Sequence, residues 1–159
     1  MLYPDNEEIK LRNAKCVVTG GAGFIGSNLV NTLVKLGSNV TILDNLSTGN
    51  LDNLKAMDSK YINFIEGDIC DQNLLNQVFD KARYVFHLAA LPSVHYSIKD
   101  PINSTEINLI GTLKALEASR INNVKKFIFA SSCAVYGNAA KNPVVESIEP
   151  AGRHVQSRA

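Results

Sequence analysis

Three glycines spaced three apart, Gly20, Gly23 and Gly26, lie between a short apolar run and an amphipathic one. This order predicts a strand, a tight turn and the start of a helix. A glycine turn lets the backbone come close to a phosphate group, and the N-terminus of the following helix favours its negative charge. The spacing therefore indicates a site for the pyrophosphate of a dinucleotide.

Asp44 closes the next apolar run and is followed by Asn45. A carboxylate at this place can accept hydrogen bonds from both hydroxyls of an adenosine ribose, and it repels a 2′-phosphate. Asn45, not an arginine that would pair with such a phosphate, comes next. We therefore expect NAD rather than NADP. The alternative role of Asp44 is an ordinary loop cap.

Polar and small residues also follow the later apolar runs. Asp68 can accept from the amino group of adenine while Ile69 packs on the ring, or Asp68 simply precedes a helix. The small residues at 88–90 would let a cofactor lie close to the backbone, or they pack against a neighbouring helix. The hydroxyls of Ser131 and Ser132 can bind a substrate oxygen, or they belong to a serine-rich turn.

The remaining candidates for chemistry are weaker. A histidine within a strand is more often structural, so we assign His87 no chemical role. Asn108 lies mid-helix despite its low helix propensity, and it can hold a loop, face the cofactor side of the sheet or face solvent. The three cysteines, Cys16, Cys70 and Cys133, are far apart, which predicts neither a metal site nor a disulfide framework. Cys16 and Cys133 are expected in the core.

Short apolar runs alternate with amphipathic ones along most of the chain. Strands are expected at 16–19, 40–43, 62–65, 84–88 and 127–130. Helices are expected at 24–36, after an N-cap at Asp71, and at 102–119. The faces of these helices are expected to carry Ile25, Leu29, Leu33 and Leu36, then Leu74, Leu75, Val78 and Phe79, then Leu109, Leu113 and Leu116. The alternation predicts an α/β fold, a doubly wound parallel sheet of the Rossmann type. Ligands bind such sheets beyond the carboxyl ends of the strands.

Length and composition set the class of protein. The 159 residues are 45% hydrophobic and 19% charged, with a net charge of +1, as in an ordinary globular domain. We expect neither nucleic acid nor a membrane as partner, no leader peptide, and a cytoplasmic location. We expect an N-terminal extension at 1–14, a dinucleotide-binding domain at 15–150 and an atypical tail at 151–159.

Five motifs in order give the chain a family resemblance. They are TGGAGFIG at 19–26, Asp44-Asn45, GDI at 67–69, HLAA at 87–90 and SSCAVYG at 131–137. Together they resemble the N-terminal part of the extended short-chain dehydrogenase/reductases, most closely the NAD-dependent nucleotide-sugar epimerases. The resemblance runs from about residue 15 to about residue 150.

The resemblance implies roles for individual residues. The pyrophosphate would be held by Gly20, Gly23, Phe24 and Ile25. The adenosine ribose would be surrounded by Asp44, Asn45, Ser47, Thr48 and Gly49. Adenine would touch Asp68 and Ile69, and the rest of the cofactor would be lined by Leu88, Ala89, Ala90 and Ser131, with Asn108 behind them. Ser132 would match the active-site residue that binds the 4-oxygen of the sugar.

The positions after Ser132 favour one reaction within the family. The related dehydratases carry an acid and a base there, and the decarboxylases a glutamate, whereas this chain has Cys133 and Ala134. A 4-epimerase is therefore favoured, with a dehydratase or another extended reductase as the alternative enzyme. The segment 91–94 looks most like epimerases of UDP-N-acetylhexosamines, with UDP-glucose close behind, and Ser93 would lie near the sugar. Intact family members are expected to be homodimers.

The Tyr-x-x-x-Lys pair with which the family performs its proton transfer is missing from this sequence. None of its five tyrosines has a lysine four positions later. We expect a Rossmann sheet truncated after about five strands, without the substrate domain, and no activity of this chain alone. A shifted reading frame or early stop near residue 151 would explain the change of sequence there. The alternative class is a non-catalytic dinucleotide-binding module.

Overall fold

The computed structural model describes residues 10–55, 57, 59–137 and 143–145. Two compact units divide the chain, 1–129 and 130–159, and each is described by itself. The first unit contains the sheet and the helices that cover it. In the second, the described structure is a short 3-10 helix, η4 (Cys133–Tyr136), with the residues that flank it.

Five parallel strands form one sheet in the order β3-β2-β1-β4-β5. They are β1 (Lys15–Thr19), β2 (Asn39–Asp44), β3 (Ile62–Glu66), β4 (Tyr84–His87) and β5 (Lys126–Phe129). The order runs outward in both directions from β1 and β4, which lie side by side. This confirms the predicted Rossmann-type sheet and places its topological switch point between β1 and β4.

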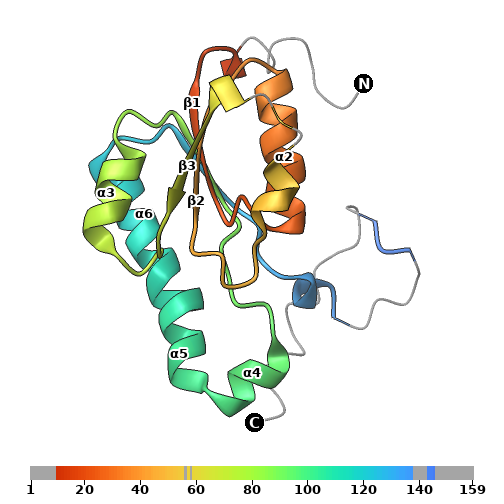
Figure 1. Ribbon diagram of the computed structural model, residues 1–159. Helices are drawn as coiled ribbons and strands as arrows, with labels where there is room; N and C mark the ends of the chain where they lie inside the picture. The colour runs from red at the N-terminus through yellow and green to blue at the C-terminus, as the bar shows by residue number, and fades with distance from the viewer. Residues whose placement is uncertain (1–9, 56, 58, 138–142, 146–159) are drawn as a thin grey trace. The chain divides into compact units, whose positions relative to one another are not determined.

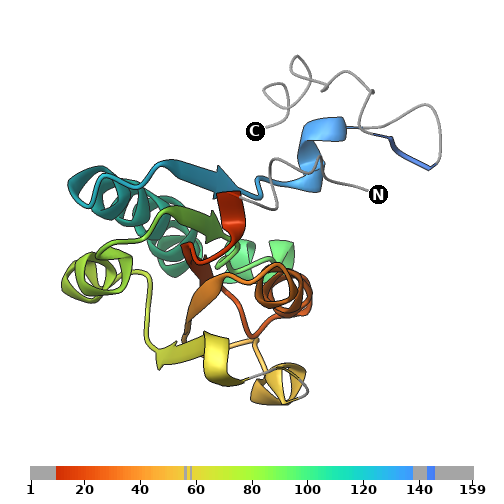
Figure 2. The ribbon, with the colours of Figure 1, turned by 90° about the horizontal axis from the view of Figure 1, so that it is seen from above.

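Helices cover both faces of the sheet (Figures 1 and 2). On one face lies α2 (Phe24–Lys35), and on the other lie α3 (Gln72–Phe79) and α6 (Thr112–Ile121). Each face has its own apolar core. Val18, Val30 and Ile42 lie in the core under α2, and Val17, Phe79 and Ala118 lie in the core under α3 and α6. The strands β1 and β2 are buried except at their first residues, which explains why the sequence there is mostly apolar.

The buried face of α2 differs from the predicted one. Its buried residues are Gly26, Ser27, Val30 and Leu33, whereas Ile25 is exposed. Ile25 stands in the first turn of the helix, and its side chain is 68% exposed. The helix ends as expected, since Gly37 takes a left-handed conformation with a φ of 80°.

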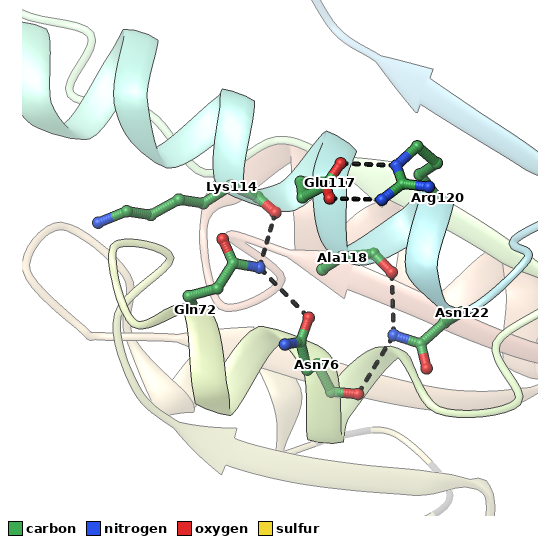
Figure 3. Close-up of polar contacts among 7 residues, drawn as sticks. All are labelled: Gln72, Asn76, Lys114, Glu117, Ala118, Arg120 and Asn122. Carbon is green, nitrogen blue, oxygen red and sulfur yellow. Dashed lines mark hydrogen bonds and ion pairs between the residues drawn. The ribbon is translucent and has the colours of Figure 1, made fainter.

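Polar contacts join α3 to α6 along their length (Figure 3). Asp71 caps α3 as predicted, accepting from the backbone N–H groups of Asn73 and Leu74. In Figure 3 the amide of Gln72 donates to the carbonyl oxygen of Lys114 at 3.3 Å, and that of Asn122 donates to the carbonyl oxygen of Asn76 at 3.3 Å. These bonds fix how α6 lies against α3, and therefore on β4.

The expected single helix over 102–119 is three pieces. They are α5 (Pro101–Thr105), a π-helical turn η3 (Glu106–Gly111) and α6. The small residues Gly111, Ala115 and Ala118 face the core, whereas Leu109, Leu113 and Leu116 are exposed. Small side chains let the helix lie close to the sheet, and this leaves the leucines on the outer side.

Several short elements were not predicted. They are α4 (Val94–Lys99), the 3-10 helices η1 (Leu51–Leu54) and η2 (Ser59–Tyr61), and η4. The expectation of a core Cys133 is wrong, because this residue stands in η4 and is exposed, whereas Cys16 is buried as predicted. Among the described residues no helix has the length and apolar character needed to cross a membrane.

Candidate functional site

The carboxyl ends of the strands meet at one edge of the sheet. Thr19, the last residue of β1, pairs with Leu43 of β2 on one side and with His87 of β4 on the other. Backbone bonds continue past the strand ends: Gly20 N–H donates to the oxygen of Leu43, and Leu88 N–H to that of Thr19, at 2.9 and 3.1 Å. Along the sequence as far as Asn108, the predicted site residues either follow these strand ends or lie close to them.

Two glycines of the turn after β1 are required by the fold itself. Gly20 has a φ of 70°, and a Cβ there would lie 2.7 Å from the backbone nitrogen of Ala89. A Cβ on Gly26 would collide with the carbonyl oxygen of Gly20. The turn therefore packs directly against the segment after β4 and against the first turn of α2, with no room for a methyl group.

Gly23 is less constrained by the fold than Gly20 and Gly26 are. Its φ is −74°, which any residue adopts, and a Cβ there would meet one atom, the oxygen of Gly20, at 3.3 Å. Gly23 is the N-cap of α2, and the first bond of that helix runs from Ser27 N–H to the oxygen of Gly23 at 2.9 Å. The amides of Phe24 and Ile25 precede that bond, and no acidic residue stands in the first turn. This end of α2 suits an anion.

Asp44 lies under the glycine turn and is 8% exposed. One carboxylate oxygen accepts from Ala22 N–H and the other from Leu46 N–H, each at 2.9 Å. A carboxylate offers about four lone-pair sites, so acceptor capacity is left for ribose hydroxyls. Gly49 folds back over this group, since a Cβ there would lie 2.8 Å from it. Ser47 and Thr48, which lie between Asp44 and Gly49 in the sequence, are exposed.

A side-chain hydrogen bond joins the loops after β2 and β3. The Asn45 amide donates to Asp68 at 3.0 Å, and Cys70 N–H donates to the other oxygen of Asp68 at 2.7 Å. Burial alone would raise the pKa of Asp68, but these bonds and the nearby Lys114 outweigh it and lower the pKa. Ile69 is buried in the core under α3 and α6, with Gly111 against its side chain, so little of it faces solvent.

The segment after β4 is held from both sides. Leu88 and Ala89 each donate a backbone N–H to the hydroxyl of Thr19 at 3.3 Å. The Asn108 side chain accepts from Leu91 N–H at 2.7 Å and donates to the oxygen of Leu91 at 3.2 Å. Of the three roles considered for Asn108, the structure shows that it holds a loop. Ala90 is exposed at this edge.

The serines predicted to bind substrate both cap short helices. Ser93 accepts from Tyr96 N–H at 3.2 Å at the start of α4. Ser132 accepts from Ala134 N–H at 3.2 Å at the start of η4. Ser131, with a φ of 57°, and Ser132 belong to the second unit. The structure therefore brings together the predicted site residues of the first unit, whereas Ser131 and Ser132 are described within the second unit.

Sequence reasoning missed Thr19, whose hydroxyl holds the segment after β4. A polar residue closing a fully buried strand next to a glycine turn was the available signal, because its hydroxyl must find partners there. No group of three or more His, Cys, Asp or Glu residues in the described part of the chain could hold a metal ion.

Comparison with known proteins places this site in context. Residues 16–155 match the family described as "NAD dependent epimerase/dehydratase family". A UDP-glucose 4-epimerase of Erwinia amylovora is 41% identical over 136 residues, which are 82% of this chain and 40% of that protein. The chain thus spans about two fifths of the length of this curated relative.

Two solved structures illustrate the likeness in fold. A UDP-N-acetylglucosamine 4-epimerase from Methanobrevibacter ruminantium M1, in complex with UDP-N-acetylmuramic acid, is 41% identical with a TM-score of 0.76, covering 87% of this chain and 44% of that one. A UDP-glucose 4-epimerase from Bifidobacterium longum, in complex with NAD+ and UDP, is 33% identical with a TM-score of 0.76, covering 87% and 43%.

Proposed function

The chain belongs to the NAD dependent epimerase/dehydratase family, and from that premise we propose that it is the NAD-binding part of a nucleotide-sugar 4-epimerase. The sugar nucleotide would be UDP-glucose or UDP-N-acetylglucosamine, as in the names of the similar proteins. When bound, NAD supplies transient oxidation at C4 of the sugar. The chain's own residues bind and orient the cofactor.

Gly23 is the observation that carries this proposal. The fold excludes a methyl group at positions 20 and 26, whereas at position 23 a Cβ would make one tight contact, at 3.3 Å from the oxygen of Gly20. A bare backbone at the start of α2 is what a pyrophosphate needs in order to approach the first-turn amides. Ligand binding therefore explains the glycine at position 23 better than the packing of the protein does.

The neighbouring residues fit the rest of the dinucleotide. Asp44 keeps acceptor capacity for the ribose hydroxyls, and its negative charge disfavours a 2′-phosphate. Asn45, Ser47, Thr48 and Gly49 would complete the ribose pocket. Asp68 would accept from the adenine amino group beside Ile69, and the segment 88–90 would line the cofactor, with Asn108 holding that segment from behind.

The sugar side of the proposal is supported by sequence and by the relatives. Ser93 would lie near the sugar and Ser132 would bind its 4-oxygen, while Ser131 would line the cofactor. We also propose a homodimer, because Leu109, Leu113 and Leu116 form an exposed apolar row that a second copy can cover. The cytoplasm is the proposed location.

Without a Tyr-x-x-x-Lys pair, this chain lacks the base with which the family takes a proton from the sugar. We propose that it binds NAD and does not epimerise a sugar by itself. It would then act, in isolation, as a dinucleotide-binding module.

The binding test compares wild-type protein with Gly23→Ala. Calorimetric titration with NAD should show binding by the wild type, and at least tenfold weaker binding by the variant, because a methyl group blocks the anion. The thermal unfolding midpoint should fall less than in Gly26→Ala, since the methyl group at position 23 meets one atom at 3.3 Å, whereas at position 26 it collides with the backbone. No heat with millimolar NAD, or equal affinities, would refute the proposed site.

Catalysis is tested separately. The purified chain, NAD and UDP-glucose or UDP-N-acetylglucosamine are incubated together, and the sugar nucleotides are separated by chromatography. We expect no 4-epimer. Formation of the epimer would overturn the proposed inactivity while leaving the binding proposal intact.

A further inference from the structure

Thr19, His87 and Thr112 form a chain of hydrogen bonds beneath the segment after β4, in which Thr19 and His87 are buried and Thr112 is half-buried. His87, the last residue of β4, is 1% exposed. Its Nδ1 lies 2.8 Å from the hydroxyl of Thr19, and its Nε2 lies 3.0 Å from that of Thr112. Three separate elements, β1, β4 and α6, are therefore linked through one imidazole ring.

Counting protons fixes the direction of each hydrogen bond. Thr112 donates its one hydroxyl proton to the carbonyl oxygen of Asn108 at 2.7 Å, so Nε2 of His87 must donate to Thr112. Burial lowers the pKa of His87 to about 4, which leaves the ring neutral at pH 7. Nδ1 then carries no proton and accepts from Thr19. The Thr19 oxygen remains an acceptor for the two backbone N–H groups after His87.

At its Thr112 end, this chain of hydrogen bonds reaches the same segment from the opposite side. Thr112 bonds the backbone of Asn108, and the Asn108 side chain bonds both backbone groups of Leu91, at 2.7 and 3.2 Å. The segment 88–91 is thus tied at its beginning through Thr19 and at its end through Asn108. His87 connects the two ties through its two ring nitrogens.

We propose that His87, as the Nε2–H tautomer, is a positioning residue that holds the segment 88–91 in the conformation that lines the cofactor. This inference rests on the proposed function, which places NAD against that segment. His87 itself contacts no ligand. It acts by ordering the segment beforehand, so that binding does not have to supply that order.

One test reads the ring directly and needs no NAD. Long-range ¹H–¹⁵N correlation spectra distinguish the two neutral tautomers and the charged form, and the His87 signal is assigned by its loss in His87→Gln. We expect the Nε2–H tautomer, unchanged between pH 8 and pH 6. A proton on Nδ1, or a charged ring at pH 6, would overturn the inference.

The second test measures what the ties do for the cofactor. His87→Phe keeps an aromatic ring beside Phe127 and Phe129, whose ring centroids lie 5.5 and 6.0 Å away, but it can form no hydrogen bond. His87→Gln retains a donor and an acceptor. We expect NAD to bind about tenfold more weakly to the Phe variant, the cost of ordering a segment of this size, and the Gln variant to recover part of that loss.

Asn108→Ala cuts the far tie without disturbing the core, because Asn108 is exposed. Asn103→Ala, an exposed asparagine of α5, is its matched control. We expect faster hydrogen exchange of Leu91 N–H and about tenfold weaker NAD binding for the first, and neither effect for the control. Wild-type affinity in both Asn108→Ala and His87→Phe would refute the inference. If the wild type itself does not bind NAD, the proposed function fails, and exchange at Leu91 still decides whether the tie exists.

Discussion

The carboxylate of Asp44 accepts a hydrogen bond of 2.9 Å from the backbone N–H of Ala22. This bond joins the end of β2 to the middle of the glycine turn after β1. The residue proposed to bind ribose thus also supports the turn proposed to bind pyrophosphate. Because one side chain serves both purposes, the informative variant removes the charge of residue 44 and keeps the size of its side chain.

Asp44→Asn is expected to weaken NAD binding about 10- to 100-fold, because one or two hydrogen bonds to a charged acceptor are lost. The preference for NAD over NADP should shrink as well, since the repulsion of a 2′-phosphate is removed. Calorimetric titration with both dinucleotides measures these changes. Asp52→Asn, an exposed position in η1, makes the same charge change and should bind like the wild type. An unchanged NAD to NADP ratio would contradict the assignment.

Gly26→Ala is expected to lower the free energy of unfolding by about 2 kcal/mol, because a methyl group there collides with the carbonyl oxygen of Gly20. Urea unfolding followed by circular dichroism measures the change. Gly23→Ala is the comparison, with an expected change well below that of Gly26→Ala. Equal destabilisation by the two variants would show that the fold requires glycine at position 23 as strictly as at position 26.

Stability should depend on the neutral state of His87. Its pKa in the folded protein is lowered to about 4 by burial, against 6.5 in an exposed histidine, so the unfolded chain binds the extra proton first. The free energy of unfolding should therefore fall as the pH drops from about 6.5 to about 4, by on the order of 3 kcal/mol. Unfolding of wild type and His87→Gln at several pH values isolates this contribution. Parallel curves for the two proteins would argue against it.

The three cysteines should react at different rates. Cys133 is exposed, whereas burial raises the pKa of Cys16, and burial together with Asp68 raises the pKa of Cys70 to about 11. Alkylation needs the thiolate, so iodoacetamide at pH 8 should label Cys133 first. Peptide mass spectrometry gives the order. Full labelling of all three in denaturant is the control, and equal rates for Cys70 and Cys133 in the native protein would contradict the expectation.

Charged residues on the exposed leucine row should prevent the proposed dimer. Leu109→Lys with Leu113→Lys replaces side chains that are 62% and 59% exposed, so the monomer loses little packing. Size-exclusion chromatography with light scattering should show a dimer for the wild type and a monomer for the variant. Leu51→Lys, on η1, should remain a dimer. A wild-type monomer at micromolar concentration would remove this proposal.

Much of the fold could be predicted because its signals are local. The apolar runs of β1 to β5 and the N-cap at Asp71 are visible in the sequence, and parallel connection rules give the sheet. The errors arise where the answer depends on a distant partner. Ile25 follows the helical periodicity but is exposed in the first turn of α2, and Leu109, Leu113 and Leu116 are exposed because smaller residues of the helix face the sheet.

For the candidate site the same distinction holds. The place of Gly20, Gly23 and Asp44 after their strands could be predicted, since the apolar runs before them have a direct physical meaning, and their contact with a dinucleotide stays a prediction. The link from His87 to Thr19 and Thr112 was not, because its members are 68 and 25 positions apart in sequence. A buried histidine shows its role once the atoms that face both of its nitrogens are known.

The π-helical turn η3 fixes the rotation about the helix axis between two groups of residues that face different targets. Asn108, within this turn, must face Leu91, while Ala115 and Ala118, beyond its end, must face the sheet. An α-helix advances about 100° per residue, so adding or deleting a single residue within η3 would turn one of these faces away from its target. The length of this turn is therefore expected to tolerate no change, even at positions where a side chain reaches solvent.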